Sequence, residues 1–346
     1  MKKRIFAPDF VRAIAVILII LTHYNARYLW LGTEIAYKKM ILGITTFNIY
    51  IGGLGVSLFL IISGYALMYT YGEKIRIWNF YQKRFWSLYP MFWIAYLVAF
   101  LHQFYCYKGM VHAAPLRNLF FSVIGIDGYL SNAHISTFYV LGEWFLGFII
   151  MFYMIFPALR WGIMKYPQIT GTIILVLYGT SILYYDLDFP QNMFLFVRLP
   201  ELAFGMYFQR YIDKVNWKAA VISMFVLLAN VVIAPAYSQD IQTTYVGISF
   251  FLLLVYISRH VKESYIIVSI CRTLCKYSYS IFLVHHYIIA YFMGKFDLNN
   301  ITVLESWILF LLICCVIGVF ARLLYLSNEY VCRRIKLSWK IKGDKS

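Results

Sequence analysis

The stretch APDFVRAIAVILIILTHYN, residues 7–25, decides the fold class of this chain. It is long and apolar enough to cross the hydrocarbon core of a bilayer, which is about 30 Å thick. The run is too long, and its end too polar, for a cleaved signal peptide, so we expect a retained membrane helix. The same stretch carries Asp9 and Arg12 near its start and His23 near its end.

The composition extends this interpretation to the whole chain of 346 residues. Hydrophobic residues make up 62% and charged residues 13%, whereas soluble domains are about half apolar and about a quarter charged. Helices are the only open structures that satisfy their backbone hydrogen bonds in lipid. We therefore predict an all-α integral membrane protein, a bundle of about ten transmembrane helices that forms a single domain over residues 1–346. The predicted spans are 9–29, 50–71, 89–106, 139–159, 168–185, 193–210, 217–235, 242–258, 277–293 and 304–326.

The basic residues predict the orientation of the chain. Of the 31 lysines and arginines, 23 fall in segments on one side of the predicted bundle, six on the other and two within spans. Positive charge is enriched on the cytoplasmic side, so we expect both termini there, with a basic tail from about residue 327. The net charge of +16 is thereby explained without nucleic acid. An apolar patch, LRNLFFSVIGIDGYL, lies in the outer segment 107–138 and is expected to enter the interface or form a short helix.

Charged groups inside a membrane span cost about 2.5 to 3.5 kcal/mol each and are candidate functional groups. Eleven residues of helix amount to three turns plus about 20°, which places Arg12 and His23 on nearly the same face, about 16 Å apart. Asp9 lies three residues before Arg12, at ion-pair spacing. Two interpretations follow. Either this face carries out chemistry, or Arg12 reaches lipid phosphates and His23 forms a hydrogen bond at a helix end.

Two further clusters combine charged groups with a proline. The segment EKIRIWNFYQKRFWSLYPMFW, residues 73–93, is either a basic, aromatic membrane anchor or an anion site with Arg84 directed into the bundle. In VRLPELAFGMYFQR, Arg198 and Glu201 are three residues apart inside a span and can pair with each other. Alternatively, Glu201 orients the histidine of the first span or binds a sugar hydroxyl.

The histidines and cysteines do not have the spacing of a metal site. His285 and His286 point about 100° apart on a helix, so they cannot bind one metal ion together, and one of them is expected to face a cavity. The six cysteines form no Cys-x-x-Cys pair, so we interpret them as packing residues and expect no metal. Glu143, beside Trp144 at a predicted outer boundary, is expected to be a solvated carboxylate.

Six stretches, taken in order, resemble the acyltransferase-3 family of integral membrane acyltransferases. The first span resembles the family's Arg-x10-His element preceded by Asp, and RLPELAFGM resembles its span that contains Arg-Leu-Pro-Glu. The other four stretches are GVSLFLIISGYAL, KRFWSLYPMFW, EWFLGFIIMFYMIFP and YSYSIFLVHH. The resemblance covers nearly the whole chain.

The resemblance implies a membrane-bound O-acyltransferase. Such an enzyme moves an acyl group, most often acetyl, from cytoplasmic acyl-coenzyme A to a hydroxyl of a cell-envelope carbohydrate such as capsule, exopolysaccharide or O-antigen. The resemblance also implies His23 as catalytic base, Arg12 as its essential partner and Arg84 as a contact to the donor. Acetyl-coenzyme A is then the donor substrate, and no metal is expected. The implied setting is a bacterial cell membrane, where the partners are the bilayer, the carbohydrate acceptor and glycan-assembly proteins.

Two positions depart from the family pattern. Ser87 stands where the family often has a second arginine before the proline, so Lys83 replaces that phosphate contact in our interpretation, and Arg12 supplies a further one. The stretch Ile149–Met151 stands where many members have a glutamate. A neutral histidine suits the role of base near neutral pH, and both direct transfer and a covalent acetyl-histidine relay fit the residues.

Two other functions fit parts of the sequence. A transporter or flippase of lipid-linked sugars or acylated glycans explains intramembrane Arg, Glu and His equally well. A glycan polymerase usually has larger outer loops than residues 107–138. The order of the six stretches favours the acyltransferase. The residues expected to bind substrate or to support the site are Glu201, Arg198, Asp9, His285 and His286.

Overall fold

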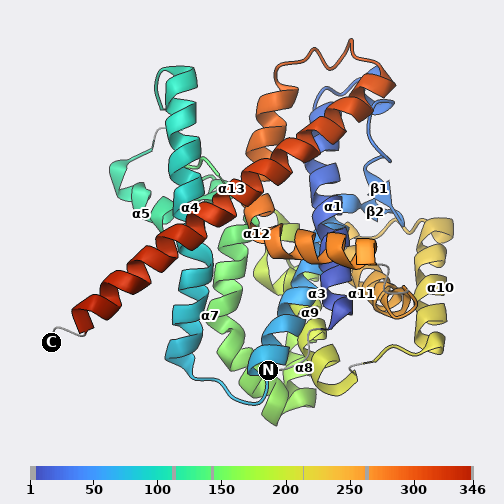
Figure 1. Cartoon of the computed structure of the whole chain (residues 1–346). Helices are drawn as coiled ribbons and strands as arrows, with labels where there is room; N and C mark the ends of the chain where they lie inside the picture. The colour runs from blue at the N-terminus through green and yellow to red at the C-terminus, as the bar shows by residue number, and fades with distance from the viewer. Residues whose placement is uncertain (1–4, 111–113, 142–143, 213, 262–264, 344–346) are drawn as a thin grey trace. The chain divides into compact units, whose positions relative to one another are not determined.

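The computed structural model describes residues 5–110, 114–141, 144–212, 214–261 and 265–343, and α-helices dominate it (Figure 1). A single two-stranded hairpin interrupts the described helices. The main helices are α1 (Phe6–Leu29), α3 (Ile51–Tyr71), α4 (Ile77–Tyr107), α7 (Trp144–Lys165), α8 (Pro167–Leu183), α9 (Leu195–Tyr207), α10 (Trp217–Ile233), α11 (Gln239–Ser258), α12 (Tyr265–Met293) and α13 (Val303–Gly343). Short elements connect them: α2 (Glu34–Tyr37), β1 (Thr45–Thr46), β2 (Ile49–Tyr50), η1 (Leu116–Asn118), α5 (Leu119–Val123), α6 (Asp127–Ser131), η2 (Gln191–Met193) and the π turn η3 (Phe208–Ile212).

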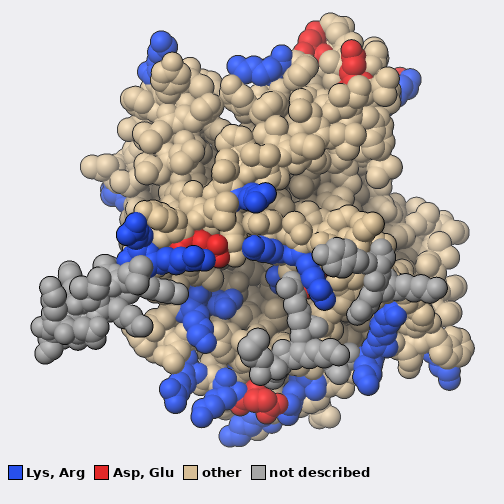
Figure 2. Space-filling model, in the orientation of Figure 1, with Lys and Arg blue, Asp and Glu red and all other residues tan. Residues whose placement is uncertain are grey.

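Seven of the described helices are long and apolar enough to cross a membrane: α1, α3, α4, α7, α11, α12 and α13. The prediction of an all-α, multi-pass membrane protein is therefore confirmed. Each of the ten predicted spans falls on a helix, but α8 and α10 have 17 residues and α9 has 13. The number of about ten crossings and the side of the termini stay predictions. Figure 2 agrees with this class, because most of the surface in view bears no formal charge.

Three helices extend beyond the apolar stretches that predicted them. Helix α4 begins at Ile77 instead of 89, α12 begins at Tyr265 instead of 277, and α13 continues past 326 to Gly343. The basic segment from about residue 327 is therefore helical over most of its length. Apolarity marks only the part of a helix that suits lipid, whereas backbone hydrogen bonding continues through polar residues.

The chain divides into two compact units. Unit 1 comprises Met1–Ile75, Ile155–Ser278 and Phe296–Phe310, and unit 2 comprises Arg76–Met154, Tyr279–Lys295 and Leu311–Ser346. Helices α7, α12 and α13 each contribute residues to both units. The prediction of a single domain stays a prediction.

Helix α3 is the centre of unit 1, where it packs against α1, α9 and α11. Glycines set the closeness of this packing. A Cβ atom added at Gly64 would lie 2.0 Å from the carbonyl oxygen of Leu202 in α9, and one at Gly205 would lie 1.9 Å from the carbonyl oxygen of Ile61. Helices α3 and α9 therefore meet backbone to backbone, as small residues allow in membrane bundles.

A tight hairpin leads directly into α3. Strands β1 and β2 pair antiparallel, with Thr46 opposite Ile49. The two residues of the turn, Phe47 and Asn48, have φ values of 50° and 59°. Two consecutive positive φ values match the type I′ turn that fits the right-handed twist of a hairpin.

In unit 2, aromatic side chains of α4 hold the segment that follows it. The Trp93 Nε1–H donates to the carbonyl of Val123 at 2.8 Å, and the Tyr89 hydroxyl donates to the carbonyl of Ile124 at 3.0 Å. The apolar patch expected to form a short helix does so as η1, α5 and α6. Asp127, at the start of α6, is only 1% exposed.

Asp127 predicts a pH dependence of stability. Burial raises the pKa of this carboxyl to about 6, although the N–H of Gly128 donates to Oδ1 at 2.9 Å and acts in the opposite direction. The pKa is higher in the folded state than in the unfolded state. The contribution of the protonated carboxyl to folding stability is therefore fully present below about pH 4 and is lost as the pH rises through 6.

Asp127→Asn removes this titration and keeps an oxygen for the Gly128 N–H. We expect the variant to gain stability relative to wild type between pH 4 and pH 7, by up to about 3 kcal/mol. Thermal melting in detergent at several pH values measures this difference. A difference that is constant over that range would contradict the assignment.

Native cysteines provide a test of the predicted orientation. Cys106 is exposed at the end of α4 that we place outside, and Cys332 lies in the part of α13 that we place in the cytoplasm. We expect a membrane-impermeant maleimide to label right-side-out vesicles through Cys106. Cys106→Ser then abolishes the labelling and Cys332→Ser leaves it unchanged. Labelling that depends on Cys332 and not on Cys106 would show that the orientation is the opposite of the predicted one.

Candidate functional site

Arg12 and His23 lie on one uninterrupted helix. Because α1 runs from Phe6 to Leu29 without a break, the eleven-residue spacing places both on nearly the same face, about 16 Å apart along the axis. Both side chains are half-buried. The Arg12 Nη1–H donates to Sγ of Cys275 in α12 at 3.7 Å. Asp9 is 7% exposed in the first turn of α1, where a carboxylate interacts favourably with the helix dipole.

Hydrogen bonds fix the end of α1 that carries His23. Asn25 is fully buried, and its Nδ2 donates to the carbonyls of Ile41 and Gly43 at 2.8 and 2.6 Å. Its Oδ1 accepts the N–H of Ile41 at 2.9 Å. One side chain therefore satisfies three backbone groups of the segment between α2 and β1.

A second network joins the same helix end to the start of α13. The Tyr24 hydroxyl donates to the carbonyl of Ser306 at 2.7 Å, and the Tyr28 hydroxyl donates to its Oγ at 2.9 Å. The Ser306 hydroxyl in turn donates to the carbonyl of Lys39 at 2.8 Å. The Lys39 ammonium, 6% exposed, donates to two carbonyls near residue 298. The backbone that positions His23 is thus fixed by segments far apart in the sequence.

A cavity of about 360 Å³ opens beside the first turn of α1, within unit 1. Its walls are mainly aromatic and aliphatic, and Arg259 is part of its lining. The cavity lies at the end of α1 that carries Asp9 and Arg12, away from His23. Its principal lining residues are Phe6, Tyr65, Phe208, Phe251, Val255 and Arg259.

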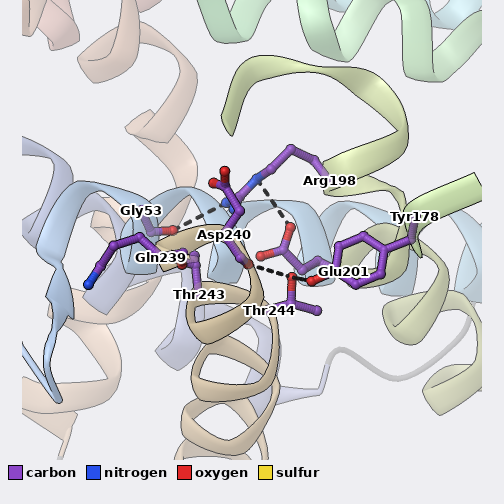
Figure 3. Close-up of polar contacts among 8 residues, drawn as sticks. All are labelled: Gly53, Tyr178, Arg198, Glu201, Gln239, Asp240, Thr243 and Thr244. Atoms are coloured by element: carbon purple, nitrogen blue, oxygen red, sulfur yellow. Dashed lines mark hydrogen bonds and ion pairs between the residues drawn. The ribbon is translucent and has the colours of Figure 1, made fainter. Parts of the chain in front are cut away.

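Arg198 and Glu201 form a buried ion pair in α9. The Nε of Arg198 lies 3.2 Å from Oε2 of Glu201, and the two side chains are 2% and 0% exposed. The pairing that the i, i+3 spacing suggested is therefore present. Figure 3 shows both side chains among residues of α3, α8 and α11.

Unit 2 holds the basic pair that the sequence indicates to be either part of a membrane anchor or an anion site. Lys83 is exposed on α4, and Arg84 is half-buried. The guanidinium carbon of Arg84 lies 5.9 Å from the ring centre of Phe80 and 5.5 Å from that of Tyr153. These rings hold the guanidinium by cation–π contact and stiffen its position.

The two adjacent histidines of α12 differ in burial, and the expectation that one of them faces a cavity stays a prediction. His285 is fully buried, with Nδ1 2.7 Å from the carbonyl oxygen of Phe282, and His286 is half-buried. Within the described residues, no group of three or more His, Cys, Asp or Glu side chains is placed to hold a metal ion. Glu143 lies outside the described residues.

The predicted site residues fall into two groups. Unit 1 contains Asp9, Arg12, His23, Arg198 and Glu201, and unit 2 contains Lys83, Arg84, His285 and His286. Sequence reasoning missed the side chains that hold the backbone around His23, because their partners come from distant segments. The small-residue run IGGLGVS at the start of α3 was the available signal for close helix packing at this site.

These features define a class of protein: an all-helical, multi-pass membrane protein with an arginine and a histidine on one face of its first helix. A family model described as an acyltransferase domain, that of the acyltransferase-3 family, matches residues 5–326. The chain therefore belongs to the acyltransferase-3 family and is a membrane acyltransferase. No curated protein and no solved structure matches it.

Asn25→Ala tests whether the contacts next to His23 stabilise the fold. The substitution leaves three backbone groups of residues 41 and 43 without their side-chain partner, two of them in buried bonds, and we expect the free energy of unfolding to fall by about 2–4 kcal/mol. Denaturation in detergent measures this loss. Asn300→Ala, at an exposed position, is the matched control and should leave stability unchanged. Equal stability of both variants would contradict the assigned role.

Proposed function

We propose that the protein is an O-acetyltransferase that moves an acetyl group from cytoplasmic acetyl-coenzyme A to a hydroxyl of a cell-envelope carbohydrate. Capsule, exopolysaccharide and O-antigen are the acceptor types that fit, and the setting is a bacterial cell membrane. The single observation that carries the proposal is the placement of Arg12 and His23 on one face of an unbroken helix in a member of an acyltransferase family.

In this mechanism, His23 is the general base. Its neutral imidazole takes the proton of the acceptor hydroxyl while the hydroxyl oxygen attacks the thioester carbonyl. The new C–O ester bond forms as the C–S bond breaks, and the proton passes to the departing thiolate. The hydrogen bonds around Tyr24 and Asn25 support this role, since they limit the movement of the helix end on which the imidazole sits.

The cationic residues bind the donor in this proposal. The nucleotide end of coenzyme A carries several negative charges, which arginine binds through charge-assisted hydrogen bonds. Arg12 is 16 Å or so from the histidine along the helix, a separation that a long, flexible donor can bridge. The cavity beside the first turn of α1 offers room for part of the donor next to Arg259. Within unit 2, Lys83 and Arg84, the latter held by two aromatic rings, are separate candidate contacts for the negative charges of the donor.

His23→Ala is the central test of this proposal. General-base catalysis contributes about 10²- to 10⁴-fold to a rate, so we expect acetyl transfer to fall at least 100-fold while donor binding persists. Purified protein in nanodiscs is incubated with radiolabelled acetyl-coenzyme A and an extract of the host's surface carbohydrate, and coenzyme A release is measured. His260→Ala, at an exposed histidine, is the matched control and should retain full activity.

The outcomes of this assay are each informative. Release that depends on both carbohydrate and His23 supports the enzyme, and a radiolabel that stays on the protein when the acceptor is omitted indicates the covalent relay. Arg12→Gln should raise the KM for acetyl-coenzyme A. Full transfer by His23→Ala would contradict the assigned base. A folded wild-type protein that neither binds coenzyme A nor releases it would instead favour a transporter of lipid-linked sugars.

A further inference from the structure

The buried pair Arg198–Glu201 links several helices of unit 1. The two residues flank Pro200 on α9, and the carboxylate of Glu201 is entirely shielded from solvent. Burying two charges is costly, and hydrophobic side chains of similar volume often serve stability equally well. Folding stability therefore does not explain why an ion pair is present at this position. The contacts that the pair makes with other helices suggest a different role.

Arg198 reaches beyond its partner to the start of α3. Its Nη2–H donates to the carbonyl of Gly53 at 3.3 Å, in the first turn of that helix (Figure 3). Asp240, in the first turn of α11, interacts electrostatically with the same guanidinium. The Tyr178 hydroxyl of α8 donates to Thr244 Oγ1 of α11 at 3.1 Å. Arg198 therefore joins α9 to the first turn of α3, and its guanidinium also interacts with Asp240 of α11.

The same turn of α3 contacts α1 beside His23. A Cβ atom added at Gly52 would lie 2.8 Å from Cγ2 of Thr22, the residue before His23. One added at Gly55 would lie 3.0 Å from Cδ1 of Ile19. The backbone of α3 therefore lies directly against α1 at this level. A shift of Gly53 relative to α9 would move the surface on which Thr22 packs.

We propose that Arg198 and Glu201 are positioning residues for the transfer reaction. Glu201 aligns the Arg198 guanidinium, which holds the Gly53 carbonyl and so fixes the first turn of α3 against α1 at Thr22. The orientation of His23 is set through this contact. The inference rests on the proposed role of His23 as general base, and it assigns neither residue of the pair to substrate binding.

The decisive variant replaces both charges with apolar groups of similar size, Arg198→Met together with Glu201→Leu. Because both charges of the buried pair are removed together, we expect the protein to fold and to melt close to the wild-type temperature. We expect kcat for acetyl transfer to fall at least tenfold, while KM for acetyl-coenzyme A stays within twofold. A purely structural pair would leave kcat unchanged in a folded protein.

Two further variants complete the test. The matched control is the same replacement in the exposed pair Glu34 and Lys38 of α2, 2.8 Å apart, which should change neither kcat nor KM. Arg198→Lys keeps the buried charges but loses the planar fork that aligns with Glu201. We expect it to fold, with kcat reduced several-fold at unchanged KM. It therefore tests the inference even where the double replacement does not fold.

The outcomes separate this inference from the function on which it rests. If the wild-type protein transfers acetyl and either the folded double variant or folded Arg198→Lys retains full kcat, the positioning role is wrong and the acetyltransferase stands. If the wild-type protein transfers no acetyl group, the proposed function is wrong, and the positioning role that rests on it is wrong as well.

Discussion

The close approach of α3 to its neighbours is the constraint on which the rest of unit 1 depends. Neither Gly64 in α3 nor Gly205 in α9 has room for a side chain, because a methyl group at either position would overlap a backbone carbonyl of the other helix. In lipid, helices gain little from apolar contact alone, so close packing of small residues supplies much of their association energy. Replacing these glycines would separate α3 from α9, the helix that carries Arg198.

Polar groups within this packed region have two different functions. Asn25, Lys39 and Ser306 satisfy backbone groups of the segments that follow α1 and α12, and they stabilise the end of α1. Arg198 acts between helices, because its carbonyl partner lies in α3. In both cases, a polar side chain that would be costly in lipid has a partner inside the protein. In the proposed mechanism, these contacts support His23, because general-base catalysis needs a positioned base.

The sequence predicted well those features that depend on local pattern. The membrane class, the ten helical stretches and the pairing of Arg198 with Glu201 all follow from hydropathy and from i, i+3 spacing. The ends of α4, α12 and α13 were placed wrongly, because helical hydrogen bonding does not stop where apolarity stops. The partners of Asn25 and Tyr24 could not be predicted, since they lie 16 and 282 residues away in the chain.

By itself, the sequence determined that this chain is a helical membrane protein and that Arg12 and His23 share one face of its first helix. Both properties arise from composition and helix period, which act over a few turns. Only the tertiary structure decided which carbonyl Arg198 holds and which helix packs against Thr22. These contacts join segments that are far apart in the sequence, so no local pattern predicts them. They form because glycines allow the helix backbones to approach closely.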